Sequence, residues 1–301
     1  MQSILSVIIA TRGRDNNLQR CLESLLDCDV PAGWTAEILV VDNGCSKYTR
    51  KLVSSLSSGD ALIQFRYLCD SRQGKSYAVN RGVANARGRI LLFTDDDVIV
   101  DKEWLEEMVQ EFCNDPGLGL VAGRVEPATP EGPLVAVTRF LERTPLNDLP
   151  SLRGSVLGCN LAIRSGVLAK VKGRDTRLGP GRGLACEDID FTYRVLRNGF
   201  RGVFSPKPVV YHEPGERDRA REYLRGWGAF YLKFILKGDR QVARQMWWQM
   251  HRIWRDFWVE AGDPFFSLNQ IWHLTVGAMI MARRIGISIL SQRSPKQNLL
   301  E

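Results

Sequence analysis

Three consecutive aspartates, Asp95, Asp96 and Asp97, directly follow a mainly apolar run at residues 89–94 and precede a second apolar run at 98–100. Adjacent carboxylates repel one another, so a folded chain that keeps them beside a buried strand usually offers them a cation. Their hard oxygen ligands suit Mg²⁺ or Mn²⁺, and an ion with few protein ligands indicates a phosphate-bearing substrate. The alternative interpretation is an inert, solvated acidic turn at a strand end.

The residues before and after this acidic triplet predict the elements that position it. Short β-rich runs alternate with helical patterns, which is typical of an α/β sheet with mostly parallel strands flanked by helices. The predicted strands cover residues 3–10, 37–41, 63–68 and 89–94, and the predicted helices cover 15–27, 48–56, 75–86 and 102–112. Ligands of such sheets bind beyond the carboxyl ends of the strands. We therefore expect one polar crevice built from the strand ends, namely Thr11–Arg14, Asp42, Asn43, Asp70 and the triplet.

The stretch from 116 to 186 is rich in glycine and proline and shows weak periodicity. Strands are predicted only at 118–122 and 155–163, and the loops around them are expected to shape a substrate pocket. A helix is predicted at 187–198, where Gly199 ends it. Two short strands, 203–204 and 209–211, are expected on either side of Pro206 and Pro208.

Composition limits the class of protein. A chain of 301 residues with 44% hydrophobic content can bury the core of one large domain, with or without an appendage. Its seven cysteines are scattered without any Cys-x-x-Cys pair, which argues against a disulfide framework or a zinc site. A reducing, cytoplasmic setting is therefore expected. The apolar start lacks a basic leading segment and predicts a first strand rather than a cleavable signal.

Charge and tryptophan are concentrated in the last part of the chain. The net charge is +7, and residues 213–301 hold 14 Lys and Arg against 9 Asp and Glu, together with six of the eight tryptophans. We therefore expect a catalytic domain at residues 1–215 and a helical region at 216–301.

This C-terminal region has the pattern of amphipathic helices at 217–237 and 242–259. Arginine and lysine alternate with tryptophan there, as expected for peripheral association with an anionic membrane surface. Polar residues within 265–289 argue against a membrane-spanning helix. The alternatives are packing on the catalytic domain or on a sister subunit in a homodimer. Nucleic-acid binding is disfavoured, because the aromatic residues fall on the apolar stripe.

Six motifs, in order along residues 3–215, resemble glycosyltransferase family 2 with its GT-A fold. They are Ser6–Arg14 with the leucine-rich helix after it, Val40–Gly44, Asn80–Gly82, Phe93–Asp97, Gly158–Ile163 and Glu187–Asp190. The resemblance implies an inverting enzyme that moves a sugar from a nucleotide-sugar donor, a UDP-sugar in our interpretation. The acceptor would be a hydroxyl or amine in polysaccharide, glycolipid or natural-product assembly.

The resemblance also implies roles for the residues at the strand ends. Asp95 and Asp97 match the two aspartates of the family's Asp-x-Asp metal motif, with Asp97 the first choice as direct ligand of Mn²⁺ or Mg²⁺. Either Asp95 or Asp96 would then contact the ribose. His212 would complete the metal site or touch the diphosphate, although a lone histidine is more often structural.

Four further residues are expected around the nucleotide and its phosphates. Asp42 matches the aspartate that accepts a hydrogen bond from the base, and Thr11 and Arg14 would lie beside the same nucleotide. Lys75 would lend positive charge to the diphosphate. For Arg14 and Lys75 the alternative is a solvated surface cation.

On the acceptor side, the resemblance places the catalytic base at Asp188, at the start of a predicted helix. Glu187 would orient the loop or the acceptor, Asp190 would face elsewhere, and Asn160 would face the acceptor side. A charge preference at a helix N-terminus is the alternative explanation of Glu187 and Asp188.

Two departures from the family pattern leave acceptor specificity open. The first motif reads Thr-Arg-Gly-Arg where many relatives have Tyr-Asn, and Cys186 replaces a common glycine. Cys69–Ser76 lacks only the first glycine of a phosphate-binding P-loop, yet that loop needs this glycine. A metal-dependent nucleotidyltransferase, or a non-catalytic membrane or nucleic-acid binding module, remains as an alternative function.

Overall fold

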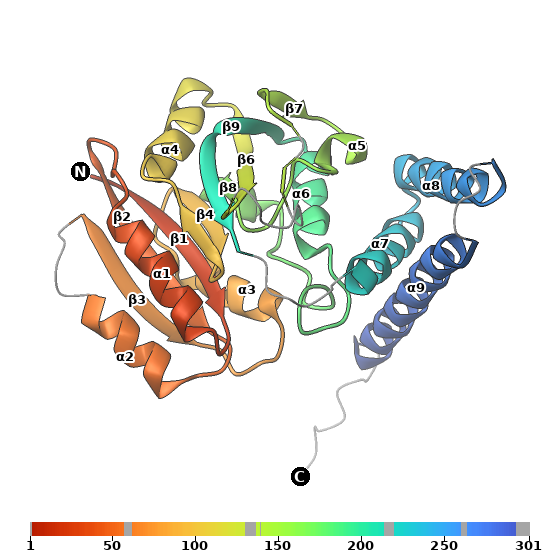
Figure 1. The fold of residues 1–301 in the computed structure, drawn as a ribbon, viewed down its shortest axis with the longest axis horizontal. Helices are drawn as coiled ribbons and strands as arrows, with labels where there is room; N and C mark the ends of the chain where they lie inside the picture. Colours follow the sequence, from red (N-terminus) through yellow and green to blue (C-terminus); the bar gives the residue numbers. More distant parts are fainter. Residues whose placement is uncertain are drawn as a thin grey trace, which may run out of the picture. The chain divides into compact units, whose positions relative to one another are not determined.

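The computed structural model describes residues 2–56, 62–129, 137–138, 140–213, 220–259 and 264–292. Two compact units share the chain (Figure 1). The first comprises Met1–Thr176 with Glu187–Arg217, and the second comprises Arg177–Cys186 with Asp218–Glu301.

The first unit is built on one sheet, in which nine strands are described, with the order β3-β2-β1-β4-β8-β6-β9-β5 and with β7 paired to β9. The strands are β1 (Ser3–Thr11), β2 (Trp34–Asp42), β3 (Ile63–Cys69), β4 (Ile90–Asp95), β5 (Val98–Val100), β6 (Leu118–Pro127), β7 (Thr144–Leu146), β8 (Leu161–Arg164) and β9 (Arg201–His212). The first four strands pair in parallel, whereas β8 is antiparallel to both β4 and β6. The predicted α/β fold is confirmed.

Helices cover both faces of this sheet. They are α1 (Asp15–Leu26), α2 (Lys47–Leu56), α3 (Lys75–Asn85), α4 (Trp104–Asn114), the short α5 (Leu149–Leu152) and α6 (Glu187–Arg197), with a 3₁₀ turn η1 at Ser165–Ala169. Ile9 belongs to the apolar core that α1 and α4 cover. Its neighbour Ile8 points the other way, because a Cβ atom on Gly82 of α3 would lie 2.5 Å from its side chain. On that second face Phe93 of β4 packs edge-on against Phe191 of α6, with ring centroids 6.3 Å apart.

The parallel register brings the polar strand ends together. Thr11 pairs with Asp42, Asp42 pairs with Cys69, and Ala10 pairs with Asp95. Because the carboxyl ends of β1 to β4 align in this way, residues that are far apart in the sequence meet at one edge of the sheet.

Three predicted strands differ from the structure. The stretch predicted at 155–163 is a strand only from Leu161 to Arg164. The two short strands predicted around the prolines form one strand, β9, whose pairing with β6 shifts register between Ser205 and Val209. This irregularity accommodates Pro206 and Pro208, which have no backbone N–H to donate.

The second unit is helical, with α7 (Ala220–Ile235), α8 (Arg240–Val259) and α9 (Pro264–Gln292). Helices α7 and α9 approach each other closely at two glycines. A Cβ atom on Gly228 would lie 1.8 Å from the carbonyl oxygen of Leu274, and a Cβ atom on Gly277 would lie 1.9 Å from the carbonyl oxygen of Arg225. A small apolar cluster joins Leu178, Leu184, Ala229 and Met281. Within the described ranges, every helix is too short or too polar to cross a membrane.

Candidate active site

Arg14 and Thr11 bind the middle and last aspartates of the triplet. The Asp96 carboxylate accepts a hydrogen bond of 2.7 Å from the Thr11 hydroxyl and one of 3.1 Å from the Arg14 guanidinium. The same Arg14 nitrogen lies 2.5 Å from Asp97 Oδ2. Burial raises the pKa of Asp96 to about 6, and the negative charge of Asp97 acts in the same direction, against the attraction of Arg14. Arg14 is therefore a counter-ion shared by two of the three carboxylates.

Lys75, the first residue of α3, forms an ion pair with Asp95. Burial opposes the charge of its ammonium group, but Asp95 and Glu187 more than compensate, so the pKa of Lys75 is raised. Lys75 is thus a charged residue within the site, and only 17% of its side chain is exposed.

His212, at the end of β9, faces Asp97. The strand pair β5–β9 places His212 opposite Val98, the residue that follows the triplet, and brings its Nε2 to 3.6 Å from Asp97 Oδ1. Although burial opposes ionisation, His212, Arg14 and Lys75 together lower the pKa of Asp97 to about 2. Asp97 is therefore ionised at any physiological pH.

Asp97 and His212 bring a carboxylate oxygen and an imidazole nitrogen, two kinds of metal ligand, close together. The described residues contain no ready-made cluster of three His, Cys, Asp or Glu ligands. Two ligands of an octahedral ion, each about 2.1 Å from it, lie roughly 3 Å apart. The 3.6 Å between Asp97 Oδ1 and His212 Nε2 is longer than this value, so the two atoms lie near each other but not at the separation of bound ligands. Magnesium-like ions often use one or two protein ligands and take the rest from phosphates and water, so the kinds of ligand that these two residues offer fit such an ion.

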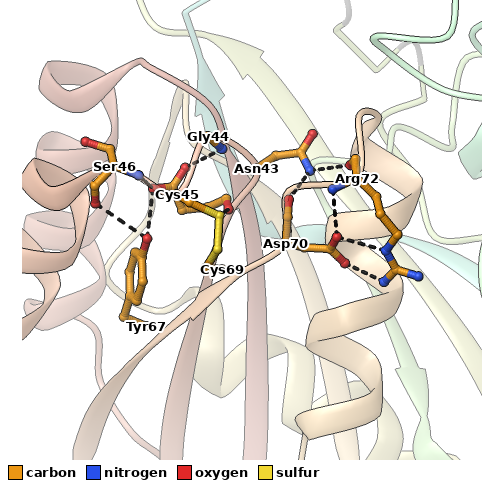
Figure 2. The surroundings of a disulfide bond; sticks show 9 residues. Asn43, Gly44, Cys45, Ser46, Tyr67, Cys69, Asp70 and Arg72 are labelled. Atoms are coloured by element: carbon orange, nitrogen blue, oxygen red, sulfur yellow. Dashed lines mark hydrogen bonds and ion pairs between the residues drawn. A yellow bond between two sulfur atoms is a disulfide. The ribbon is translucent and has the colours of Figure 1, made fainter.

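Asp42 is fully buried and organises the loop that follows β2. Its carboxylate accepts hydrogen bonds from the backbone N–H groups of Gly44 at 2.7 Å and Ser46 at 2.6 Å, and from the Tyr67 hydroxyl at 3.1 Å. Figure 2 shows this loop beside the end of β3, where Asn43 donates to the carbonyl oxygens of Asp70 and Arg72. In this structure Asp42 therefore has a structural role, and the base contact expected for it stays a prediction.

A disulfide bond joins Cys45 and Cys69 in the same loop region (Figure 2), which corrects the expectation that the cysteines are reduced. Cys69 ends β3 opposite Asp42, so Cys45, three residues beyond Asp42, comes to a Cα–Cα distance of 5.1 Å from it. Sequence spacing alone could not show this pair, because it depends on the β2–β3 register. The other five cysteines are free, and all but Cys113 are buried.

Glu187 and Asp188 stand at the N-terminus of α6, and the charge of Glu187 acts on Lys75. Asp188 Oδ2 accepts a hydrogen bond of 2.9 Å from the backbone N–H of Gly158. Burial and the neighbouring charge of Asp188 raise the pKa of Glu187 to about 6. Arg174 lies 3.6 Å from the Glu187 carboxylate and is the buried cation that our sequence interpretation missed. The only feature of the sequence that could have pointed to Arg174 is that it is a basic residue in a glycine-rich segment.

Asn160 does not face an acceptor in this structure, because its side chain has no exposed surface. Its amide N–H groups donate to the carbonyl oxygens of Arg124 at 2.8 Å and Pro208 at 2.9 Å. Its carbonyl oxygen accepts from the Trp104 indole at 2.9 Å. Asn160 therefore joins α4, β6 and β9, and the expected contact with the acceptor is replaced by a structural role.

The fold and the site define an α/β protein with a charged crevice at the carboxyl edge of its parallel strands. Residues 6–171 match the sequence profile described as "Glycosyl transferase family 2", which covers more than half of the chain. The chain therefore belongs to glycosyl transferase family 2.

Two curated relatives carry the same kind of name. Over 210 residues the chain is 28% identical to "Glycosyltransferase AglE" of Haloferax volcanii, covering 69% of this chain and 66% of AglE. It is 24% identical over 301 residues to "Probable glycosyltransferase YdaM" of Bacillus subtilis, covering 92% of this chain and 69% of YdaM. This chain thus spans about two thirds of each relative.

Two solved structures share the fold at low identity. Residues 1–349 of S. aureus TarS superpose with a TM-score of 0.63 at 16% identity, covering 100% of this chain and 95% of that one. The mannosyltransferase PcManGT of Pyrobaculum calidifontis, solved in complex with GDP-Man and Mn2+, superposes with a TM-score of 0.56 at 17% identity, covering 97% of this chain and 79% of that one. At these identities the likeness shows the fold alone.

The disulfide predicts a loss of stability in Cys69→Ser. Cys45 and Cys69 are 24 residues apart, and closing a loop of this length in the unfolded chain stabilises the folded state by about 3 kcal/mol. Urea unfolding without reductant should show this loss, whereas Cys113→Ser, which removes an exposed free thiol, should leave the free energy of unfolding unchanged. Equal stability of Cys69→Ser and wild type would contradict the prediction.

The raised pKa of Glu187 predicts a pH-dependent stability. A carboxyl whose folded-state pKa rises from 4.5 to about 6 stabilises the fold below pH 4.5, and this contribution is lost as the pH rises through 6. The glutamine in Glu187→Gln cannot ionise, so the variant does not lose this contribution. The free energy of unfolding of Glu187→Gln minus that of wild type should therefore be roughly 2 kcal/mol larger at pH 8 than at pH 4. Urea titrations at a series of pH values measure this difference. A difference that stays constant with pH would show that Glu187 has an ordinary pKa.

Proposed function

We propose that this protein is a metal-dependent, inverting glycosyltransferase that moves a sugar from a nucleotide-sugar donor, a UDP-sugar, to an acceptor hydroxyl or amine. The acceptor belongs to polysaccharide, glycolipid or natural-product assembly. The observation that carries the proposal is Lys75, which pairs with Asp95 of the triplet on one side and interacts with Glu187 at the start of α6 on the other. Family membership supports glycosyl transfer, and the bound GDP-Man and Mn2+ of PcManGT support a nucleotide-sugar donor and a metal ion, without favouring uridine as the base.

The donor's diphosphate is proposed to lie against the acidic triplet and its cations. Asp97 and His212 would hold Mn²⁺ or Mg²⁺, with Asp95 as a further candidate ligand. The ion supplies positive charge that stabilises a departing nucleoside diphosphate. Lys75 and Arg14 are the chain's own cations at this place, and each can exchange a carboxylate partner for a phosphate oxygen.

The acceptor is proposed to lie against Asp188. A single displacement forms a bond from the acceptor oxygen or nitrogen to the sugar carbon, breaks the bond from that carbon to the diphosphate oxygen, and inverts the configuration at the carbon. Asp188 would take the acceptor's proton, because its carboxylate is partly exposed while the Gly158 N–H fixes its orientation. Glu187 would orient the acceptor beside it.

The two carboxylates should fail in different ways when neutralised. Asp188→Asn should lower sugar transfer by about 100-fold or more with donor binding kept, because only the proton acceptor is lost. Asp97→Ala should instead lose the Mn²⁺-dependent part of donor binding. Release of UDP from a panel of UDP-sugars measures turnover, and the shift in unfolding temperature caused by UDP with and without Mn²⁺ measures binding.

The control for these variants is Asp115→Asn, which removes a carboxylate that pairs with Arg201 on the surface. It should match wild type in both measurements. Equal turnover and binding in Asp188→Asn, Asp97→Ala and wild type would refute the assignment. Release of pyrophosphate in place of UDP would establish a nucleotidyltransferase.

We further propose that helix α8 of the helical unit associates peripherally with an anionic membrane surface, at the cytoplasmic face. Helix α8 exposes Trp247, Trp248 and Trp254, each to between 56% and 58%. Arg244 and Arg255 are exposed on the same helix. Exposed indole rings beside arginines suit the headgroup region of anionic lipid. A homodimer formed through the same helix is the competing proposal.

The cytoplasmic location stays a prediction, and the Cys45–Cys69 bond weighs against it because disulfides persist mainly in oxidising compartments.

Membrane association predicts that the double variant Trp247→Gln, Trp248→Gln sediments less with vesicles that contain anionic lipid. The matched control is Trp272→Gln, which removes a tryptophan with 61% exposure from α9. We expect the control to sediment like wild type and the double variant to lose about tenfold in vesicle affinity, because two interfacial side chains are removed. Unchanged sedimentation of the double variant, with a change of oligomeric state in gel filtration, would favour the homodimer.

A further inference from the structure

Arg174 is a buried arginine in the segment before α6. The residue is 4% exposed. Its backbone is fixed by Asn80 of α3, whose amide donates to the Arg174 carbonyl oxygen at 2.8 Å and accepts from its N–H at 2.7 Å. The backbone from which the guanidinium extends is therefore held by α3.

The guanidinium has charge partners but no hydrogen bonds. It lies 3.6 Å from the Glu187 carboxylate, beyond hydrogen-bond distance, and its Cζ lies 5.2 Å from the centre of the Phe93 ring. None of its three nitrogens makes a hydrogen bond with the described residues. Buried donors are nearly always satisfied, so a group of this kind calls for a partner that the chain itself does not provide.

The Arg174 guanidinium lies close to Asp188, the proposed catalytic base. A Cβ atom on Gly158 would lie 3.1 Å from Asp188 Oδ2 and 3.5 Å from Arg174 Nη1, so the two side chains flank the same point. The charge of Arg174 also acts on Lys75, the cation that pairs with Asp95. Two cations, the buried Arg174 and the mostly buried Lys75, therefore lie near Asp188 and the triplet respectively.

We propose that Arg174 is an anion-binding residue of the active site, and that its planar guanidinium binds an oxyanion of the substrate beside Asp188. The oxyanion is either a phosphate group of the donor's diphosphate or the carboxylate of an acidic sugar. Both present paired oxygens that match the fork of N–H groups on arginine, which lysine cannot reproduce. This inference rests on the proposed glycosyl transfer. The competing account is that Arg174 only neutralises Glu187.

The test is calorimetric titration of the full chain, with Mn²⁺ present, by UDP, GDP, UDP-glucose and UDP-glucuronate. Wild type is compared with Arg174→Gln and Arg174→Lys. The control is Arg66→Gln, because Arg66 likewise pairs with a buried glutamate, Glu37. The double variant Arg174→Gln, Glu187→Gln removes both charges of the pair, and it decides the question if Arg174→Gln alone does not fold.

We expect Arg174→Gln to weaken binding by about tenfold or more, with Arg174→Lys intermediate and Arg66→Gln unchanged. A loss that includes UDP or GDP identifies the diphosphate as the oxyanion, and a loss confined to UDP-glucuronate identifies a sugar carboxylate. Affinities within about threefold of wild type for every ligand would overturn the role of Arg174 while leaving the proposed function intact. If wild type binds none of the four ligands, the proposed function falls together with this inference.

Discussion

The repulsion among three consecutive carboxylates is the constraint that the crevice depends on. Ionised groups are stable at this depth only when each has a partner, because the solvation they lose must be replaced. Each carboxylate here has a partner from a different element, with Lys75 of α3 on Asp95, Thr11 of β1 on Asp96, and His212 of β9 on Asp97. The positions of these elements and the charge balance of the site therefore depend on each other.

The same environment gives neighbouring aspartates different properties. The pKa of Asp97 is lowered to about 2, so it offers a charged oxygen at every pH at which the protein works. The pKa of Asp96 is raised to about 6, because its burial and the negative charges of Asp97 and Asp95 outweigh the opposing effect of Arg14 and of the hydrogen bond from Thr11. Asp97 thus suits a cation or a phosphate-bound ion, whereas Asp96 suits the scaffold that holds Arg14. Three consecutive aspartates that look equivalent in the sequence thus include two with different surroundings and different pKa values.

Local patterns predicted most of the fold but few of the contacts within the site. The strands and helices of the first unit follow from periodicity, which residues within one segment determine, and the polar strand ends follow from where each strand stops. The Cys45–Cys69 bond, the burial of Asp42 and the place of Arg174 depend on strand register and on loops without periodicity. Asn160 shows the same limit, since a polar residue in a family motif proved to be a buried link between α4, β6 and β9.

Helix α8 is a case in which periodicity predicted the element but not its exposed face. Ile253 and Val242 of this helix are buried. Yet Met246 is 37% exposed, next to the exposed Trp247 and Trp248. A helix that only packs within its own unit needs one apolar face, and the opposite side can be polar. Helix α8 carries large aromatic side chains outside its buried face, where water gives them no stabilisation, and this surplus of apolar surface is what the proposed membrane association would cover.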